Sequence, residues 1–212
     1  MSHLPWVVTV SRVPTVRDQQ LQHALRLGWF TIAYNLVEGA VAIGAGAAAG
    51  SSALIGFGLD SGVESLSAAV LIWRLRVEQR DPERAEEVER RALRLIGATL
   101  LVLAVYVGVE AVRALLSSSQ PESSPVGIAL TGLSLIVMPI LAARKRTVGE
   151  AMGSRAVLAD AAETRACVYL SVVVFVGLAL NAAFGWWWAD PVAALGVVWF
   201  LVGEGREALE GD

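Results

Sequence analysis

The sequence has few charged residues and a single cysteine, Cys167. Asp, Glu, Lys and Arg together make up 17% of its 212 residues, whereas soluble domains usually hold about a quarter. With 55% hydrophobic residues and a mean hydropathy of +0.58, this shortage argues against a soluble enzyme or a disordered chain. The net charge of −3 gives no basic excess to attract phosphate, so we expect no nucleic-acid partner. One cysteine cannot form an intramolecular disulfide, so disulfides do not hold the fold.

Lysine is also nearly absent. The basic residues are 16 arginines and one lysine, in a chain rich in alanine, glycine, valine and leucine. This composition indicates the coding bias of a GC-rich bacterium. Since the apolar residues come in long blocks, we expect a multi-pass protein of the bacterial inner (plasma) membrane, surrounded by the lipid bilayer.

Six apolar blocks can cross a bilayer, which takes roughly 20 mostly apolar residues per helix. Because backbone polar groups in lipid must be satisfied within the segment, these blocks should be helices. The sequence therefore predicts an all-α membrane protein, a bundle of six transmembrane helices. The predicted spans are residues 28–49, 53–72, 93–116, 126–143, 155–184 and 191–203, the last continuing helically to about residue 208.

The predicted connections alternate in charge. Residues 73–92 and 144–155 are rich in basic side chains, whereas residues 50–52, 117–125 and 185–190 have none. Basic loops stay in the cytoplasm, so both termini are predicted to be cytoplasmic. We divide the chain into a cytoplasmic N-terminal tail (1–24) and a six-helix transmembrane domain (25–212). The first 20 residues are too polar for a cleavable signal peptide.

The second connection mixes arginines with acids. Between Arg74 and Arg94 there are seven arginines and six acidic residues, a pattern typical of a solvated helical hairpin with i,i+4 ion pairs. A metal-collecting loop would be expected to contain histidine, and this segment has none.

Ionisable residues inside the predicted spans are the main functional signal. Each costs about 2.5–3.5 kcal/mol on insertion scales, so such residues tend to be functional and to face the bundle interior. Asp60 and Glu64 are spaced i,i+4 and share one face of the second predicted helix. Glu163 and Cys167 repeat that spacing on the fifth, and Asp160 lies on the same stripe. The intramembrane acids are Glu38, Asp60, Glu64, Glu110, Asp160 and Glu163.

Helix rise places Glu64 and Glu163 near the membrane midplane. Asp60, Glu64, Glu163 and Cys167 would thus offer three carboxylates and one sulfur at one depth, which suits a tetrahedral divalent-metal site. When the site is empty, mutual repulsion should keep protons on some carboxylates, and a metal would displace them. This is a physical basis for exchanging a metal ion against protons.

Other polar residues are weaker candidates for the metal site. Asp160, Glu38 and Asn35 are possible supporting or auxiliary groups, although Asp160 could instead cap a helix or pair with Arg155 or Arg165. Cys167 could be a small core hydrophobe, and the Asp60 and Glu64 pair could be interhelical packing. Arg165 points away from the Glu163 stripe and is expected to pair elsewhere, and Glu110 is expected to be structural.

Two segments resemble the cation diffusion facilitators, a family of divalent-metal/proton antiporters. The run from Ser154 to Glu163, SRAVLADAAE, is similar to that family's S-x-x-L-x-A-D-A-x-H motif, and the entry to the sixth helix at Trp188–Pro191 also fits. In the second helix, Asp60 and Glu64 occupy the place of the family's H/D-x-x-x-D pair.

This resemblance implies a homodimer of six-helix bundles with ligands Asp60, Glu64, Glu163 and Cys167. Family members that transport zinc have His at the position of Glu163 and Asp at that of Cys167. The carboxylate of Glu163 is a harder ligand than histidine, and the thiol of Cys167 is a softer ligand than aspartate. Since the chain stops at Asp212, we expect the transmembrane domain alone, without the family's cytoplasmic C-terminal domain.

The sequence therefore predicts a transporter that exports a divalent transition metal from the cytoplasm by proton antiport. Zinc is the expected substrate, with Mn, Fe, Co and Cd as other possibilities and protons as the counter-ion. The alternative is a carrier or channel for a non-metal cation, with the acids as a proton relay. A structural subunit would not need so many mid-span acids. An enzyme is not expected, because His3 and His23 both lie outside the predicted spans and leave no histidine base in the membrane.

Overall fold

The computed structural model describes residues 15–49, 52–117, 124–184, 186 and 188–210. Within these ranges the regular structure is helical and no strand is found. A short 3₁₀ turn, η1 (Pro82–Arg84), separates α2 from α3. The helices are α1 (Val16–Ala49), α2 (Ser52–Arg80), α3 (Ala85–Ser117), α4 (Pro125–Met152), α5 (Arg155–Phe184) and α6 (Ala189–Glu210).

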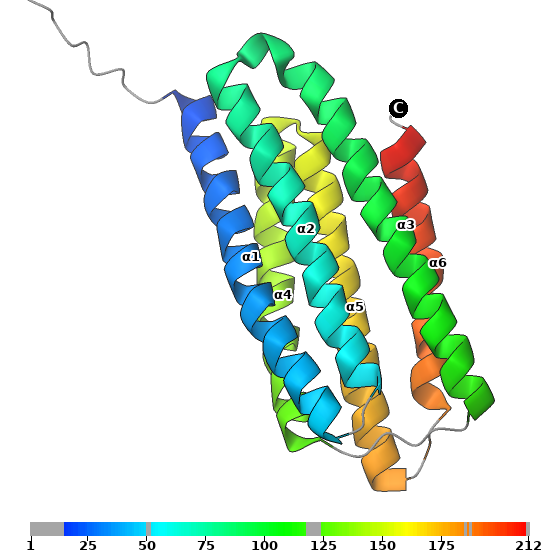
Figure 1. Cartoon of the computed structure of the whole chain (residues 1–212). Helices are drawn as coiled ribbons and strands as arrows, with labels where there is room; N and C mark the ends of the chain where they lie inside the picture. Colours follow the sequence, from blue (N-terminus) through cyan, green and yellow to red (C-terminus); the bar gives the residue numbers. More distant parts are fainter. Residues whose placement is uncertain (1–14, 50–51, 118–123, 185, 187, 211–212) are drawn as a thin grey trace, which may run out of the picture.

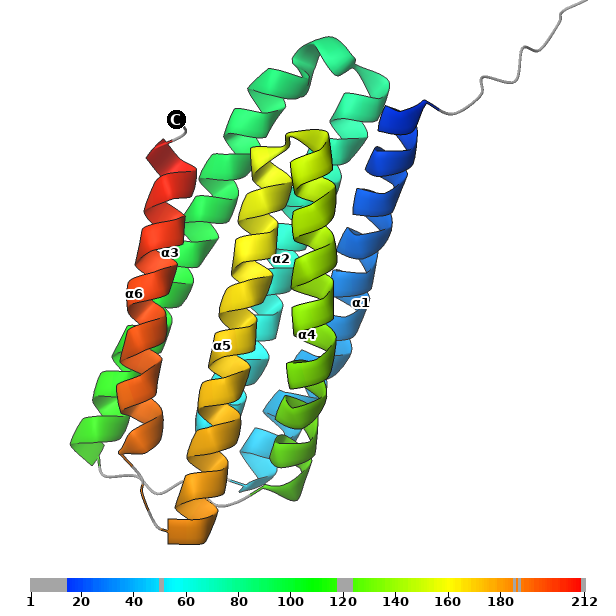
Figure 2. The ribbon, with the colours of Figure 1, turned by 180° about the vertical axis from the view of Figure 1, so that it is seen from behind.

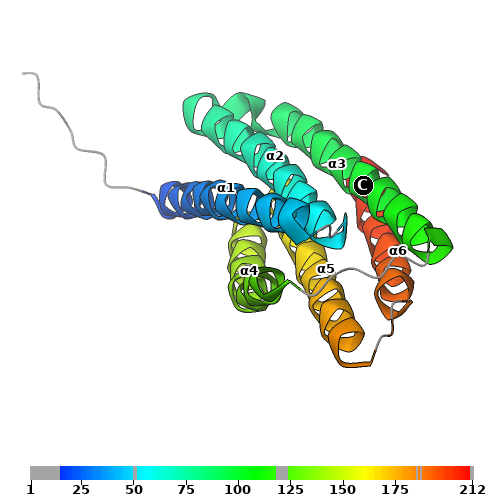
Figure 3. The ribbon, with the colours of Figure 1, turned by 60° about the horizontal axis from the view of Figure 1, so that its bottom comes forward.

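The helices form one elongated bundle with two parts. In Figures 1 and 2, α1, α2, α4 and α5 run alongside one another, and α3 and α6 form a pair on the side of α2 and α5. Figure 3, turned so that the bottom of the bundle comes forward, shows α4 beside α1 and α5 between α4 and α6. Helix α5 contacts α2, α3, α4 and α6. Polar side chains on α5 can therefore be matched by groups from several helices.

The start of α4 is capped by Ser124, which accepts a hydrogen bond from the Gly127 amide at 3.1 Å. Pro125 follows in the first turn, where its missing N–H costs nothing.

A tight turn after α4 sets the register between α4 and α5. The helix ends at Gly153, whose φ of 61° is left-handed and strain-free only for glycine. Since only residues 153 and 154 join the two helices, the last turns of α4 must face the first turns of α5.

Glycines let α1 and α2 approach closely. A Cβ atom added to Gly39 would lie 2.9 Å from the Gly58 carbonyl oxygen, and one added to Gly58 would lie 2.9 Å from the Gly39 carbonyl oxygen. Gly62, one turn further along α2, has open space where a Cβ would stand. Close packing of α1 against α2 therefore depends on Gly39 and Gly58 and not on Gly62.

Among the described residues, four helices meet the length and apolar composition needed to cross a membrane: α1, α2, α3 and α4. This supports the predicted helical membrane class, while the count of six spans stays a prediction. The start of α1, the end of α6 and the α2–α3 and α4–α5 connections all lie at one end of the bundle (Figure 1). Large apolar side chains stand on the outside along the helices, for example Leu36, Val102, Ile136 and Trp199, as expected of a surface that faces lipid.

The helices extend beyond the predicted spans. Helix α1 begins at Val16, inside the predicted tail 1–24, of which residues 1–14 lie outside the described ranges. Helix α4 runs to Met152, so the prediction that Arg144, Lys145 and Arg146 lie in a loop is wrong. The predicted fourth span stopped before the first charged residue because only apolar residues were counted. The backbone nevertheless remains helical for two more turns.

Ion pairs join the helices at the end of the bundle where α1 starts and α6 ends. Arg74 on α2 pairs with Glu78 one turn along and with Glu89 on α3, and both Arg74 and Glu78 are buried. Arg17 on α1 donates to Glu78 at 2.7 Å and to the Met152 carbonyl at 2.6 Å. The predicted helical hairpin is present, but its inner face forms the core of this network and is not solvated.

Glu89 also caps the start of α5. Its carboxylate accepts hydrogen bonds from the Ser154 hydroxyl at 2.9 Å and from the Ala156 amide at 2.7 Å. An acidic group at a helix N-terminus satisfies free amides and complements the helix dipole. Together with Arg74, this carboxylate connects α2, α3 and α5 and fixes where α5 begins.

Candidate functional site

The acids predicted inside the spans are buried where α2 and α5 face each other. Asp60 and Glu64 lie on α2, and Asp160 and Glu163 lie on α5, each exposing 1% or less of its surface. Cys167 on α5 is 2% exposed and carries a free thiol. We call these five residues the acid layer. Helix spacing explains the arrangement, because residues three, four and seven apart share a face.

Within the acid layer, the Cys167 thiol lies beside the Asp60 carboxylate. It is also close enough to Glu64 and Glu163 to interact with them electrostatically. Asp60 Oδ1 has no hydrogen-bond partner. Two of the predicted ligands, one from each helix, are therefore already adjacent.

Glu64 is connected to α5 through a hydroxyl group. Thr164 Oγ1 donates a hydrogen bond to Glu64 Oε1 at 2.6 Å, and Thr164 is fully buried. The other oxygen, Glu64 Oε2, has no partner. Thr164 was not among the predicted site residues, since a threonine in an apolar run has no signal of its own.

Glu163 is the least satisfied member of the acid layer. Ser67 on α2 lies beside it, but neither carboxylate oxygen makes a well-formed hydrogen bond, and the side chain is fully buried. A buried carboxylate without partners is costly, so it must gain a proton or a cation. In the described part of the chain, no three Cys, His, Asp or Glu side chains converge closely enough to hold one metal ion together.

The structure adds a cation that the sequence analysis placed elsewhere. Lys145 on α4 is 1% exposed, and its Nζ lies 2.8 Å from Asp160 Oδ2 and 3.9 Å from Glu64 Oε1. It also donates a hydrogen bond to Thr164 Oγ1 at 2.8 Å. The suggestion that Asp160 pairs with Arg155 or Arg165 is replaced by this ion pair with Lys145.

A pattern in the sequence of α4 could have revealed this lysine. Helix α4 buries one stripe, and Lys145 belongs to it, while Arg144 and Arg146 on either side are exposed. An i, i+3, i+4 series of this kind is the usual mark of an inward-facing helix surface. In this half of α4 the stripe comprises Met138, Leu141, Ala142, Lys145, Val148, Gly149 and Met152.

Glu38 forms a second buried polar group next to the acid layer. Its carboxylate accepts hydrogen bonds from Tyr34 at 3.1 Å, from Ser61 at 3.0 Å and from Ser134. These donors come from α1, α2 and α4, so Glu38 is well satisfied where it lies. Asn35, 1% exposed, has no partner for either its Oδ1 or its Nδ2 atom. Both residues are thus buried, as the prediction of supporting groups requires.

The remaining intramembrane charges pair away from the acid layer. Arg165 pairs with Glu204 on α6 at 3.0 Å, which confirms that it has a partner elsewhere. Glu110 pairs with Arg113 on the same helix at 2.8 Å, which fits the structural role expected for it.

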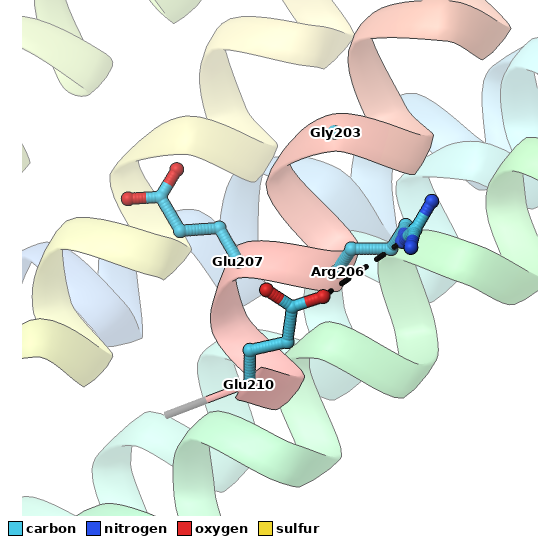
Figure 4. Close-up of a pocket in the computed structure, with 4 residues that line it drawn as sticks. All are labelled: Gly203, Arg206, Glu207 and Glu210. Carbon is cyan, nitrogen blue, oxygen red and sulfur yellow. Dashed lines mark ion pairs between the residues drawn. The ribbon is translucent and has the colours of Figure 1, made fainter. Parts of the chain in front are cut away.

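A surface hollow lies at the end of α6. Figure 4 shows its lining, Gly203, Arg206, Glu207 and Glu210, with Arg206 and Glu210 drawn as an ion pair. The two charged groups are 3.9 Å apart, and both side chains are about 70% exposed. Since all four residues belong to the last turns of α6, this hollow does not include the acid layer.

Comparison with known proteins identifies the family. Residues 29–210 match the family model described as the cation efflux transmembrane domain. The chain belongs to the cation efflux family. This confirms the resemblance carried by the motifs of α2 and α5, and the match extends over all six helices of this cation efflux chain.

Several curated proteins are similar to this cation efflux chain. The uncharacterized transporter sll1263 of Synechocystis is 32% identical over 172 residues, which cover 79% of this chain and 56% of the relative. Magnetosome protein MamB of Magnetospira is 24% identical over 157 residues, 72% of this chain and 53% of MamB. Transmembrane protein 163 of Xenopus laevis is 27% identical over 137 residues, 65% of this chain and 48% of that protein.

The chain spans about half the length of the curated relatives it matches. The shared part corresponds to the helical bundle, because the family model itself covers the transmembrane domain. The similarity therefore concerns the region that contains the acid layer.

Proposed function

We propose that this chain transports a divalent transition-metal cation through the acid layer, exporting it from the cytoplasm in exchange for protons. The observation that carries the proposal is the set of buried, incompletely paired carboxylates of Asp60, Glu64 and Glu163 beside the Cys167 thiol, in a chain of the cation efflux family. These groups are the ligands we propose for the metal.

The chemistry of the layer supports exchange with protons. Carboxylates buried at this density repel one another and hold protons when no cation is present. A divalent ion needs deprotonated ligands and would release those protons on binding. Because Glu64 Oε2, Asp60 Oδ1 and both Glu163 oxygens have no partner, these atoms are the first available to a cation.

The proposed arrangement in the membrane has six spans and both termini in the cytoplasm. Helices α5 and α6 have 30 and 22 residues, or roughly 45 and 33 Å at 1.5 Å per residue, so each is long enough to cross a core of about 30 Å. The start of α1 and the end of α6 lie at the end of the bundle that carries the arginine network (Figure 1). This agrees with a cytoplasmic location of basic residues. We further propose a homodimer in the bacterial inner membrane.

Zinc is the substrate that we propose. Zinc accepts both carboxylate and thiolate ligands in a four-coordinate site, and the proposed ligands supply three carboxylates and one sulfur. Mn²⁺, which prefers oxygen ligands, would depend less on the thiol. The rank of ions therefore tests what Cys167 contributes.

Metal flux into proteoliposomes tests the proposed function. Purified protein is reconstituted with a metal-sensitive and a pH-sensitive dye trapped inside, and Zn²⁺, Mn²⁺, Fe²⁺, Co²⁺ and Cd²⁺ are offered in turn. We expect metal entry with simultaneous proton movement in the opposite direction. Liposomes that contain the Glu163→Ala protein serve as the matched control.

Two results would contradict the proposal. Metal entry without proton movement would exclude proton antiport, although the protein would still be a metal transporter. No flux of any ion from well-folded protein would favour the alternative, a carrier or channel for a non-metal cation, and transport blocked by an organic cation would support it.

A further inference from the structure

Lys145 brings a positive charge into the layer of carboxylates that we propose to bind the transported cation. The ammonium group is buried, forms an ion pair with Asp160 at 2.8 Å and lies 3.9 Å from Glu64. We propose that Lys145, held by Asp160, is a tethered counter-cation that competes with the transported metal for Glu64. This inference rests on the proposed function, because it assigns Lys145 a role at the same site.

The charge balance of the layer motivates the competition. The facing sides of α2 and α5 carry four carboxylates, those of Asp60, Glu64, Asp160 and Glu163. A buried carboxylate is unfavourable unless it is paired. Lys145 occupies one face of this cluster from a third helix. A divalent ion bound to Glu64 would lie within a few ångströms of the ammonium. Two like charges at that distance repel strongly in a buried setting.

The hydrogen-bond geometry gives the ammonium a route away from Glu64. Lys145 reaches Glu64 partly through Thr164, whose hydroxyl accepts from Nζ and donates to Glu64 Oε1. Asp160 alone can hold the ammonium when a metal takes Glu64, since that ion pair is the shorter of the two. The lysine then returns to its bridging position when the metal leaves, which favours release.

The choice of residue fits a mobile charge. Lys145 is the single lysine among 17 basic residues. Lysine carries a compact charge on a flexible four-carbon stem, whereas arginine presents a planar group that favours fixed, two-pronged pairing. The fixed ion pairs of this protein, such as Arg74 with Glu78 and Glu89, use arginine.

The first test measures metal affinity when this charge is removed. Zn²⁺ binding to Lys145→Gln, Lys145→Arg and wild-type protein is measured by competition with a chelating dye in lipid nanodiscs. We expect Lys145→Gln to bind about tenfold more tightly than wild type or better, as removal of a nearby like charge predicts. Lys145→Arg, which keeps the charge, should not bind more tightly than wild type.

The matched control is Arg146→Gln. Arg146 is adjacent in sequence but exposed, and it pairs with Glu150 on the helix surface at 2.7 Å. Removing this charge should leave Zn²⁺ affinity unchanged. If Lys145→Gln binds Zn²⁺ with the affinity of wild type or more weakly, the competition is contradicted.

A second measurement uses wild-type protein and covers the case in which Lys145→Gln does not fold. Because the chain has one lysine, incorporation of ¹⁵Nζ-lysine gives one side-chain ammonium signal. We expect this signal to shift on addition of Zn²⁺, with the same midpoint as the dye titration. A signal that does not move while Zn²⁺ binds would overturn the inference.

The outcomes separate the two proposals. Wild-type protein that binds Zn²⁺ and transports it, with equal affinity in Lys145→Gln and an unmoved lysine signal, overturns the counter-cation role and leaves the proposed function standing. Wild-type protein that binds none of the offered divalent ions overturns both.

Discussion

The hydroxyl oxygen of Thr164 lies 2.6 Å from Glu64 Oε1, and this hydrogen bond joins the first third of α5 to the middle of α2. The same oxygen accepts a hydrogen bond from Lys145 Nζ at 2.8 Å. A single hydroxyl group therefore connects three helices at the depth of the acid layer. Since all three residues are buried, loss of this group cannot be compensated by bulk water.

Replacing Thr164 by valine should destabilise the protein. The change keeps the shape of the side chain but leaves Glu64 and Lys145 each with one partner fewer, which typically costs about 1.5–3 kcal/mol when charged groups are involved. The control is Thr31→Val, because Thr31 is equally buried but bonds only to the Leu27 carbonyl of its own helix. Denaturant unfolding in detergent measures both, and equal losses would show that the bridge contributes nothing particular.

Glu64→Ala and Glu163→Ala should each abolish metal transport and leave the helical fold intact. Both remove a carboxylate that we propose to bind the cation, whereas Glu110→Ala removes one that only pairs with Arg113 on α3. Proteoliposome flux measures transport, and circular dichroism with gel filtration reports the fold. Flux near the wild-type rate in both variants would remove the proposed site.

Cys167→Ser should shift ion preference towards harder cations. The thiol is buried beside Asp60, and a hydroxyl in its place keeps a small polar group but not the soft sulfur ligand. We expect the flux of Cd²⁺ relative to Mn²⁺ to fall by about tenfold, as a loss near 1.4 kcal/mol implies. An unchanged rank of ions would indicate that the thiol only packs.

Gly58→Leu should weaken the contact between α1 and α2. Even a Cβ atom at this position would lie 2.9 Å from the Gly39 carbonyl oxygen, so the helices would have to separate, at a cost of about 1–3 kcal/mol. Gly62→Leu is the matched control on the same helix, because a Cβ atom at that position would meet open space. Thermal unfolding should show a lower midpoint for Gly58→Leu alone, and a comparable drop in both variants would contradict this packing.

Glu89→Ala should be far more destabilising than Glu87→Ala. Glu89 pairs with buried Arg74 and caps α5, and breaking a buried pair costs about 3–5 kcal/mol. Glu87 pairs with Arg91 in solvent, with exposures of 48% and 60%, and such pairs contribute about 0–1 kcal/mol. Unfolding free energies in detergent compare the two, and similar small losses would mean that Arg74 finds another partner.

The sequence by itself determined the class of protein and most of the candidate site. Apolar blocks too long for a soluble core require helices that satisfy their own backbone. The 3.6-residue period then fixes which residues share a face, so Asp60 with Glu64 and Glu163 with Cys167 could be paired without a structure. The motifs around these residues were also sufficient to indicate the cation efflux family.

Only the tertiary structure decided which side chains contact the buried carboxylates. Lys145 stands between two exposed arginines, and a run of three basic residues is typical of a cytoplasmic loop. The helix nevertheless continues, because the turn at Gly153 comes eight residues later and the stripe of α4 that includes Lys145 packs against α5. Whether a charge is buried depends on the packing partner of its helix face, which lies far away in the sequence. For the same reason, the hydroxyl bridge between Lys145 and Glu64 is formed by Thr164, a residue that no sequence pattern singled out.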